Sequence, residues 1–291
     1  MDPGRECIDR FLEGRPDARA PFVPIIDHLA ARIDAIPYAE MCAAPGAWSA
    51  ALIKTARLIE ADAVVTTLDM TTVERACRGD GPAATAIETL QGVVATAGPS
   101  MGCAAALPGP VSSARQLFAE EDHATALKRL KRAYGELVES VLQVRPDLVM
   151  FVEDLNDFDG IMPAGAARAY NTLRNLAAHY NVVTATYIDG YKSTELDSVA
   201  ATRADVYVLG TELGGSPPAL SSAVDLAQGA LGAGISIALE SPKIARTELE
   251  AAAEASANGC NLLITSRGPV RPEIDLEALR ALIGDRRGAN A

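Results

Sequence analysis

The sequence is poor in cysteine, and its cysteines are not spaced for cross-linking or metal binding. There are five of them, an odd number, and no Cys-x-x-Cys spacing occurs. They lie far apart, at Cys7, Cys42, Cys77, Cys103 and Cys260. Neither a disulfide framework nor a zinc ribbon is therefore indicated.

Positive charge and long apolar runs are also scarce. The 26 Lys and Arg residues are outnumbered by 38 Asp and Glu, for a net charge of −12, which argues against a nucleic-acid partner. No stretch reaches the ~18–20 uninterrupted apolar residues of a membrane span. The first residues, MDPGRECIDRFLEG, are polar and acidic, unlike a signal or transit peptide. We expect a soluble, cytoplasmic protein with no membrane partner.

Short apolar runs, by contrast, recur along the chain, and each is followed by a segment with helical spacing. Most are continuously apolar, which is typical of parallel strands buried on both faces. Eight strands alternating with helices predict a closed (β/α)8 TIM barrel, and no Gly-x-Gly-x-x-Gly follows the first strand to favour an open sheet. The expected strands are 21–27, 61–69, 102–109, 147–154, 182–189, 204–210, 235–240 and 260–265.

The size of the chain fits one domain of this kind. Its 291 residues are 49% hydrophobic, enough to bury a large α/β core. We predict a single barrel domain over residues 1–291. Residues 1–18 are expected to form an arm or a helix across the bottom of the barrel, and residues 284–291 a frayed tail.

Ionisable side chains collect where the expected strands end. In barrels the active site lies at the carboxyl ends of the strands. This concentration at one rim favours an enzyme over an inert scaffold. The rim residues are Asp27, His28, Asp69, Glu153, Tyr187, Asp189, Glu240 and Arg267.

The third expected strand stops at a rigid turn, Pro108-Gly109-Pro110, from which a helix starts. Proline has no amide proton, so the ladder ends there and the backbone position is tightly fixed. The turn is either plain scaffolding or the wall of a site.

Four short motifs occur at or near the ends of expected strands along the chain. Asp69 precedes TVERACRG, Leu107 begins the Leu-Pro-Gly-Pro turn, Glu153 stands in MFVEDLND, and the last strand runs into ITSRGPVRPEIDLEAL. In this order the motifs resemble the uroporphyrinogen decarboxylase superfamily over roughly residues 15–285. The resemblance implies a TIM barrel, and a substrate pocket whose wall includes Pro108 and Gly109.

The first expected strand departs from the decarboxylase branch of this family. That branch binds a polycarboxylate tetrapyrrole through an arginine-rich M-R-Q-A-G-R segment. The corresponding segment here reads IIDHLAARIDAI, with Asp27 and His28, and Arg267 replaces the branch's histidine near the eighth strand. Because an acidic rim repels such a substrate, we predict that uroporphyrinogen is not decarboxylated.

The other branch transfers methyl groups between a small molecule and a corrinoid carried on a partner protein. Its thiol-methylating members bind zinc through H-x-C-G after the fifth strand and a cysteine after the eighth. Here the first motif reads YIDG, so Tyr187 and Asp189 replace His and Cys, and Cys260 lies at the start of the last strand. Zinc remains an option, but its usual Cys and His ligands are absent.

The resemblance and the rim together predict a corrinoid-dependent methyltransferase that acts on a small molecule. Two ways of activating the substrate stay open. In the first, Asp189 and Glu153, aided by His28, bind a metal ion through oxygen ligands. In the second, a carboxylic acid, Asp69 or Glu153, protonates the leaving oxygen. The predicted catalytic residues are Asp69, Glu153, Asp27 and His28, and the predicted substrate-binding residues are Arg267, Tyr187, Pro108 and Gly109.

The cofactor and partner predictions follow from what the sequence carries. No D-x-H-x-x-G cobalamin motif occurs, which favours a corrinoid on a partner protein. A homodimer stays open. The alternatives are decarboxylation of a tetrapyrrole or a smaller acid, and a non-catalytic barrel that serves as a binding or scaffold subunit.

Overall fold

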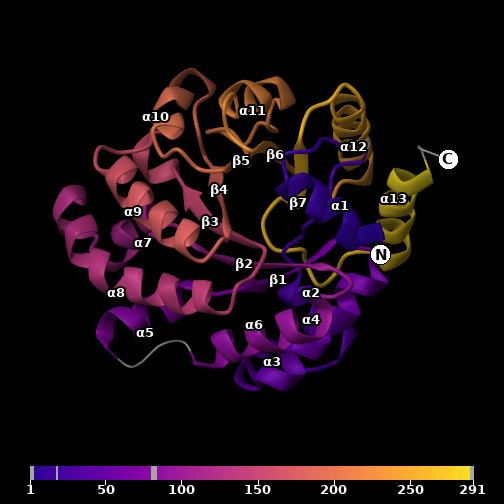
Figure 1. Cartoon of the computed structure of the whole chain (residues 1–291), viewed down its shortest axis with the longest axis horizontal. Helices are drawn as coiled ribbons and strands as arrows, with labels where there is room; N and C mark the ends of the chain where they lie inside the picture. Colours follow the sequence, from indigo (N-terminus) through magenta and orange to yellow (C-terminus); the bar gives the residue numbers. More distant parts are fainter. Residues whose placement is uncertain (1–2, 18, 80–83, 289–291) are drawn as a thin grey trace.

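Seven parallel strands curl round a common centre, in the same order in space as in the sequence, and helices surround them (Figure 1). The computed structural model describes residues 3–17, 19–79 and 84–288. The α/β barrel class predicted from the sequence is confirmed. The strands are β1 (Ala63–Thr67), β2 (Gly102–Pro108), β3 (Leu148–Asp154), β4 (Val183–Asp189), β5 (Val206–Leu209), β6 (Gly232–Ile237) and β7 (Leu262–Ser266).

The helices pack outside the strands, and within the described ranges none has both the length and the apolarity that crossing a membrane requires. Two 3-10 turns, η1 (Asn156–Phe158) and η2 (Ser193–Glu195), lie between them. The helices are α1 (Pro3–Leu12), α2 (Asp27–Ile33), α3 (Tyr38–Ala43), α4 (Pro45–Leu58), α5 (Met70–Arg78), α6 (Ala84–Ala97), α7 (Pro110–Leu117), α8 (His123–Gln143), α9 (Ala166–His179), α10 (Leu196–Ala200), α11 (Leu220–Leu226), α12 (Pro242–Ala257) and α13 (Leu276–Gly288).

Local sequence explains where several helices begin. Pro45, Pro110 and Pro242 occupy the first position of α4, α7 and α12, where a missing N–H costs nothing and the fixed φ suits the helix. Asp122 caps α8 by accepting the N–H of Thr125 at 3.1 Å. Two of these starts, at Pro110 and Pro242, follow β2 and β6 and so lie at the carboxyl ends of those strands.

The segment 21–25 closes the barrel in place of a regular eighth strand. Phe22 forms a parallel bridge with Ile264 of β7, and Val23 N–H donates to the Ile264 carbonyl at 2.8 Å. On the other side, Asp62 N–H donates to the Phe22 carbonyl at 2.9 Å. The Asp62 carboxylate in turn accepts the Phe22 N–H at 2.8 Å and pairs with Arg19 at 2.9 Å. The barrel is therefore closed by a short seam in which a side chain takes part.

Two expected strands differ from the observed ones for physical reasons. The expected strand 21–27 is cut short because Pro24 has no N–H and α2 begins at Asp27. The expected strand 235–240 lies too late, since β6 covers Gly232–Ile237. Glu240, expected at the end of that strand, is exposed in the turn before α12.

The start of β6 was missed because glycine has a weak strand preference. Close packing nevertheless requires glycine at two positions of this strand. A Cβ at Gly232 would lie 2.8 Å from Phe11 Cε2, and one at Gly234 would lie 2.8 Å from Val208 Cγ2. Both glycines allow other side chains to fill the barrel interior.

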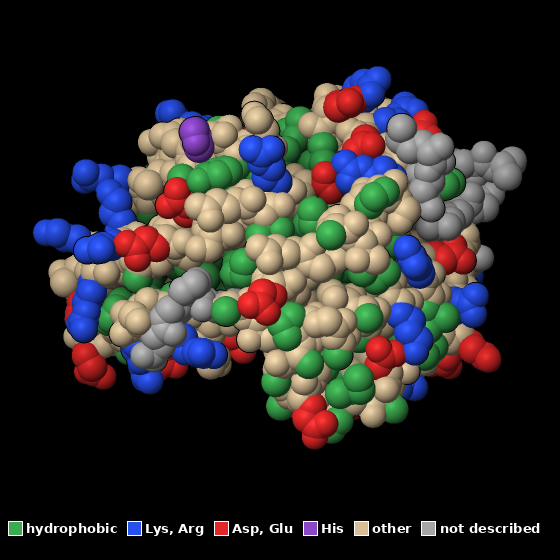
Figure 2. Space-filling view, turned by 60° about the horizontal axis from the view of Figure 1, so that its bottom comes forward, with side chains coloured by type: hydrophobic (Ala, Val, Ile, Leu, Met, Phe, Trp, Pro, Cys, Tyr) green, Lys and Arg blue, Asp and Glu red, His purple; other side chains and the backbone are tan. Residues whose placement is uncertain are grey.

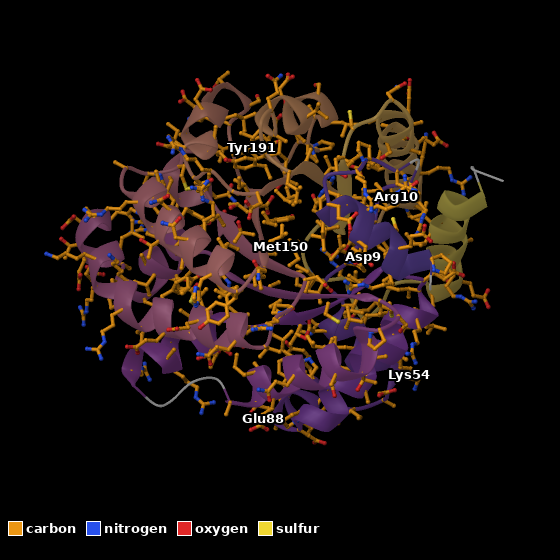
Figure 3. All side chains as sticks on the ribbon, viewed as in Figure 1. Asp9, Arg10, Lys54, Glu88, Met150 and Tyr191 are labelled. Atoms are coloured by element: carbon orange, nitrogen blue, oxygen red, sulfur yellow. The ribbon has the colours of Figure 1, made fainter. Side chains whose placement is uncertain are left out.

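Helix α1 packs against the amino-terminal side of the strands and fastens several of them. Arg5 pairs with Asp147 at 2.7 Å and with Asp9 at 2.6 Å, and the Asn261 amide donates to the Phe11 carbonyl at 2.9 Å. Asp9, labelled in Figure 3, lies on this helix. At the other end of the chain the predicted frayed tail begins at 284, but α13 continues to Gly288. Residues 289–291 lie outside the described residues.

The buried side chains form two layers. A large cluster fills the space between the strands and the outer helices. A smaller one fills the barrel interior, where Ala104, Ala106, Met150 and Tyr187 meet. Figure 3 shows Met150 near the middle of the molecule. The interior is thus packed with side chains up to Tyr187, near the carboxyl end of β4.

Replacing Asp62 with alanine is expected to lower the free energy of unfolding by about 3–5 kcal/mol, because Asp62 is fully buried and its loss leaves the half-buried Arg19 and the Phe22 N–H without their acceptor. Urea unfolding followed by the fluorescence of the single tryptophan, Trp48, measures this. The matched control is Asp34→Ala, which removes an exposed ion pair with Lys54 and should cost less than about 1 kcal/mol. Equal losses in the two variants would contradict a role of Asp62 in closing the barrel.

Candidate active site

The register of β3 and β4 decides which rim residues face the barrel interior. Tyr187 belongs to the interior cluster, and side chains two residues apart on a strand share a face. Asp189 therefore lies on the interior side. Its register partner on β3 is Asp154, whereas Glu153 pairs with Ile188. Asp154 and Asp189 share one face of the sheet, and Glu153 lies on the other.

Tyr187 stands at the centre of the rim with a buried hydroxyl that has no hydrogen-bond partner among the described residues. Its side chain is 3% exposed. Burial and the charge of Asp189 raise the pKa of the phenol to about 12, so it keeps its proton at neutral pH. Ser236, Arg267 and the Gly268 backbone oppose this rise in the pKa, although none of them makes a hydrogen bond of ordinary geometry with the phenol.

Asp189 is fixed by the loop that follows β5. Its carboxylate accepts the N–H of Thr211 at 2.6 Å and also the Thr211 hydroxyl. The approach is possible because residue 210 is glycine. A Cβ at Gly210 would lie 2.7 Å from Asp189 Oδ1 and 2.9 Å from the Tyr187 hydroxyl. Thr211 and Gly210 thus hold Asp189 beside Tyr187.

Arg267 follows β7 and is anchored to α12. Its guanidinium pairs with Glu248 at 2.6 Å, and the other Glu248 oxygen accepts the Ala238 N–H at 2.9 Å. The Arg267 Nε is buried and has no partner in the described part of the chain, and the same holds for the Ser236 hydroxyl. The rim therefore offers three buried polar atoms, on Tyr187, Ser236 and Arg267, that a polar ligand could satisfy.

Glu153 lies away from this group, between β3 and the helices α7 and α9. It is fully buried and accepts four hydrogen bonds. The donors are the Val111 N–H at 3.0 Å, the Ser112 N–H and hydroxyl at 2.7 Å each, and the Tyr170 hydroxyl at 2.7 Å. The structure does not bring Glu153 and Asp189 together, because they lie on opposite faces of the sheet.

The Pro-Gly-Pro turn is shaped by Glu153. Gly109 N–H donates to the Val152 carbonyl at 2.7 Å, and a Cβ at Gly109 would lie 2.7 Å from Glu153 Cγ and would overlap its carboxyl carbon. The Pro108 carbonyl accepts the Tyr134 hydroxyl at 2.6 Å. The turn therefore seats the start of α7 on a buried carboxylate. Pro108 itself is paired with Val152, on the interior side of β3.

Asp27 is the second buried carboxylate of the rim. It is 2% exposed, and it accepts the Trp48 indole N–H at 3.0 Å and the Thr67 hydroxyl at 2.5 Å. Burial raises its pKa, and the hydrogen bonds from Thr67 and Trp48 oppose the rise. The contacts join α2, α4 and the end of β1.

His28 and Asp69 flank this carboxylate at the surface. His28 is exposed on α2 and stacks on Tyr38, with ring centroids 4.2 Å apart. Asp69 is exposed and caps α5, accepting the Thr72 N–H at 2.9 Å and the Thr72 hydroxyl at 2.8 Å. Burial raises the pKa of Tyr38, and the charges of Asp27 and Asp69 add to that rise. These residues form one corner of the rim.

The side chains at the rim do not fit the zinc site that the family resemblance implies. Tyr187 and Asp189 stand where the family has His and Cys, and Cys260 precedes β7, at the end of the strand away from the rim. Over residues 3–17, 19–79 and 84–284, no three His, Cys, Asp or Glu side chains gather where one metal ion could bind them. The grouping of Asp189, Glu153 and His28 is therefore not formed.

The chain matches no family model and no curated protein. Among solved structures, it is similar to a methyltransferase from Methanosarcina mazei, with 15% identity, 100% coverage of both chains and a TM-score of 0.73. A putative vitamin-B12 independent methionine synthase from Listeria monocytogenes matches with 9% identity over 93% of this chain and 96% of that one, with a TM-score of 0.55. D-psicose 3-epimerase from Clostridium cellulolyticum H10 matches with 13% identity over 83% and 92%, with a TM-score of 0.51. At such identities the likeness shows a shared TIM-barrel fold.

Gly109→Ala is expected to destabilise the fold by about 1–3 kcal/mol or more, because the added methyl group collides with the Glu153 carboxyl. Gly46→Ala is the matched control, since no atom lies within 4 Å of a Cβ at that position in α4. There alanine should be neutral or should stabilise by up to about 1 kcal/mol. Urea unfolding compares the two, and similar changes would argue against tight packing at the turn.

Glu153→Gln is expected to lower the free energy of unfolding at pH 7 by about 1–3 kcal/mol, because an amide offers one acceptor oxygen where the carboxylate offers two. Burial raises the pKa of Glu153, and the Ser112 hydroxyl opposes this. A raised pKa in the folded state adds stability that is complete below the unfolded pKa and is lost as pH rises through the folded pKa.

The glutamine variant should therefore lack part of the fall in stability that the unchanged protein shows as pH rises above the range of an ordinary glutamate. Urea unfolding at several pH values between ~4 and 8 measures the slope of the free energy of unfolding against pH. This interval covers the pKa of an ordinary Glu and the pH values above it. Glu136→Gln, in an exposed pair with Arg132, should leave the slope unchanged. If Glu153→Gln has the same slope as the unchanged protein, burial does not raise the pKa of Glu153.

Proposed function

We propose that this chain is a methyltransferase that moves a methyl group between a small methylated compound and a corrinoid carried on a partner protein. The observation that carries the proposal is the match, over the whole of both chains, to the fold of a methyltransferase. The similarity to a putative vitamin-B12 independent methionine synthase supports methyl transfer and does not bear on the corrinoid. Tyr187, Ser236 and Arg267, at the centre of the rim, offer a proton donor and polar contacts for the substrate, which such a transfer needs.

Tyr187 is the proposed proton donor. Its hydroxyl is buried, has no partner among the described residues and is protonated at neutral pH. In the demethylating direction the bond from the methyl carbon to the substrate oxygen or nitrogen breaks, and that atom takes the phenolic proton. The resulting phenolate lies near Arg267, whose positive charge lowers the pKa of Tyr187.

Arg267 and Ser236 are proposed to orient the substrate. Each has a buried polar atom without a partner in the described part of the chain, and a carboxylate or hydroxyl on the substrate would satisfy both. Asp189, held by Thr211, keeps Tyr187 protonated until the transfer begins. A reduced corrinoid, when bound, supplies a cobalt nucleophile for the methyl group.

Asp27 and Glu153 are assigned to holding the rim in shape. Both are buried with their oxygens hydrogen-bonded, so neither is free to donate to a substrate. The exposed Asp69 and His28 remain predicted catalytic residues. Asp154 and Asp189 on the interior face also disfavour a polycarboxylate such as uroporphyrinogen.

The test is to mix the purified chain with a reduced corrinoid protein and a panel of methoxy and methylamine compounds, and to follow methyl-corrinoid by its cobalt absorption bands. Tyr187→Phe should lower the turnover number by about 100-fold with little change in KM, since it removes a proton donor. Tyr207→Phe is the matched control. Its hydroxyl faces the outer layer and donates to the Ala200 carbonyl, so turnover should hold.

Two results would overturn the proposal. One is the absence of methyl-corrinoid across the panel while uroporphyrinogen loses carbon dioxide, which would favour the decarboxylase alternative. The other is equal turnover in Tyr187→Phe and the unchanged protein, which would remove Tyr187 from the chemistry.

A further inference from the structure

A groove of about 470 Å³ runs between α8 and α9 on the outside of the barrel. Its walls are apolar and include Leu127, Leu130, Leu173 and Leu176. The volume lies within the ~300–1,000 Å³ typical of sites for small organic ligands. Neither the rim nor the proposed methyl transfer uses this groove.

Three cations border the groove without partners. Lys128 and Lys131 on α8 and Arg168 on α9 line it, and in the part of the chain that the structure describes none of the three makes an ion pair. The neighbouring cations on α8 are paired: Arg129 with Glu121, and Arg132 with Glu136. The cations left unpaired on α8 are thus the ones at the groove.

This local charge is opposite to that of the chain, whose net charge is −12. Among the described residues that line the groove, none is acidic. On the side of the molecule where Figure 1 places α8, Figure 2 shows Lys and Arg side chains with Asp and Glu side chains among them. An anion that reaches the groove therefore meets positive charge there without local repulsion.

The cations lie toward one end of the groove, where apolar side chains accompany them, and the lining beyond them holds no charged side chain. Lys128 and Arg168 lie in the first two turns of α8 and α9, with Leu127, Leu130 and Lys131 nearby on α8. Tyr134, Leu173 and Leu176 lie further along these helices. A charged end and an apolar body are complementary to this arrangement. A wholly polar anion would pair with the cations alone, and a wholly apolar molecule would contact the apolar lining alone.

A glycine inside α8 keeps the groove open. Gly135 lies in the middle of a 21-residue helix, where glycine costs about 1 kcal/mol relative to alanine. No atom lies within 4 Å of the position a Cβ would take there. Packing within the fold therefore does not require glycine at this position, and a larger side chain would occupy the groove.

We propose that the α8–α9 groove binds a medium-chain alkyl carboxylate, with the carboxylate at Lys128, Lys131 and Arg168 and the alkyl chain along Leu173, Leu176 and Gly135. The proposal does not depend on the proposed methyl transfer. The bound chain would touch Tyr134, whose hydroxyl holds the Pro108 carbonyl of the rigid turn.

Isothermal titration of the full chain with decanoate, below its micelle-forming concentration, tests the proposal. Decanoate should bind at one site per chain, and decanol and acetate should each bind at least about tenfold more weakly, since each lacks half of the complementarity. Binding of decanol as tight as that of decanoate, or no heat of binding with decanoate, would overturn the proposal.

Two variants locate the site. Gly135→Leu fills the groove and should abolish decanoate binding while the unfolding midpoint stays the same or rises, because leucine is the better helix former. Lys131→Gln should weaken binding and reduce its salt dependence. Arg132→Gln, which removes an exposed cation paired with Glu136, should change neither.

The remaining outcomes are also decisive. Unchanged binding in Gly135→Leu would place decanoate elsewhere and overturn the proposal. If sedimentation shows a dimer of the unchanged protein that Gly135→Leu dissociates, the groove is covered by a second copy of the chain and the carboxylate site is rejected.

Discussion

Closure of the barrel at the seam between β7 and β1 is the constraint on which the rim depends. The segment that fills this seam has few backbone bonds of its own, and the Asp62 carboxylate supplies an acceptor that a regular neighbouring strand would have provided. The next residues lead directly to Asp27, and Val270 N–H donates to the Ile25 carbonyl. The seam therefore sets where the first corner of the rim and the residues after β7 meet.

Two buried carboxylates then divide the rim into regions with different roles. Asp27 joins the helices next to β1, and Glu153 joins the Pro-Gly-Pro turn to α9 through Tyr170. Their oxygens are engaged with protein donors, which makes both regions rigid. Between them, Tyr187 and Arg267 carry buried polar atoms without partners among the described residues. Rigid surroundings and unsatisfied polar atoms are features of a site that is prepared for a ligand.

The barrel could be predicted from the sequence because continuously apolar runs alternate with helical segments along the chain. The same feature limited the prediction of the site. In a strand buried on both faces, hydrophobicity does not reveal which side chains point inward, so Glu153 and Asp154 could not be told apart. The register with β4 decides between them. Ser236 was missed because the two glycines of β6 concealed where that strand begins. Thr211 stands at the end of an expected strand, but its contact with Asp189 joins the loop after β5 to the end of β4 and leaves no local pattern in the sequence.

The packing of α1 also bears on how the chain reaches its native state. This helix precedes every strand in the sequence, yet its Phe11 carbonyl accepts a hydrogen bond from Asn261, next to the last strand. Val23 likewise bonds to Ile264. On the ribosome these two groups have no partners until β7 has emerged, and contacts so distant in sequence form slowly. Part of the apolar face of α1, including Phe11 beside Gly232 of β6, therefore stays uncovered until late in synthesis. At that stage a nascent chain is exposed to aggregation and depends on chaperones.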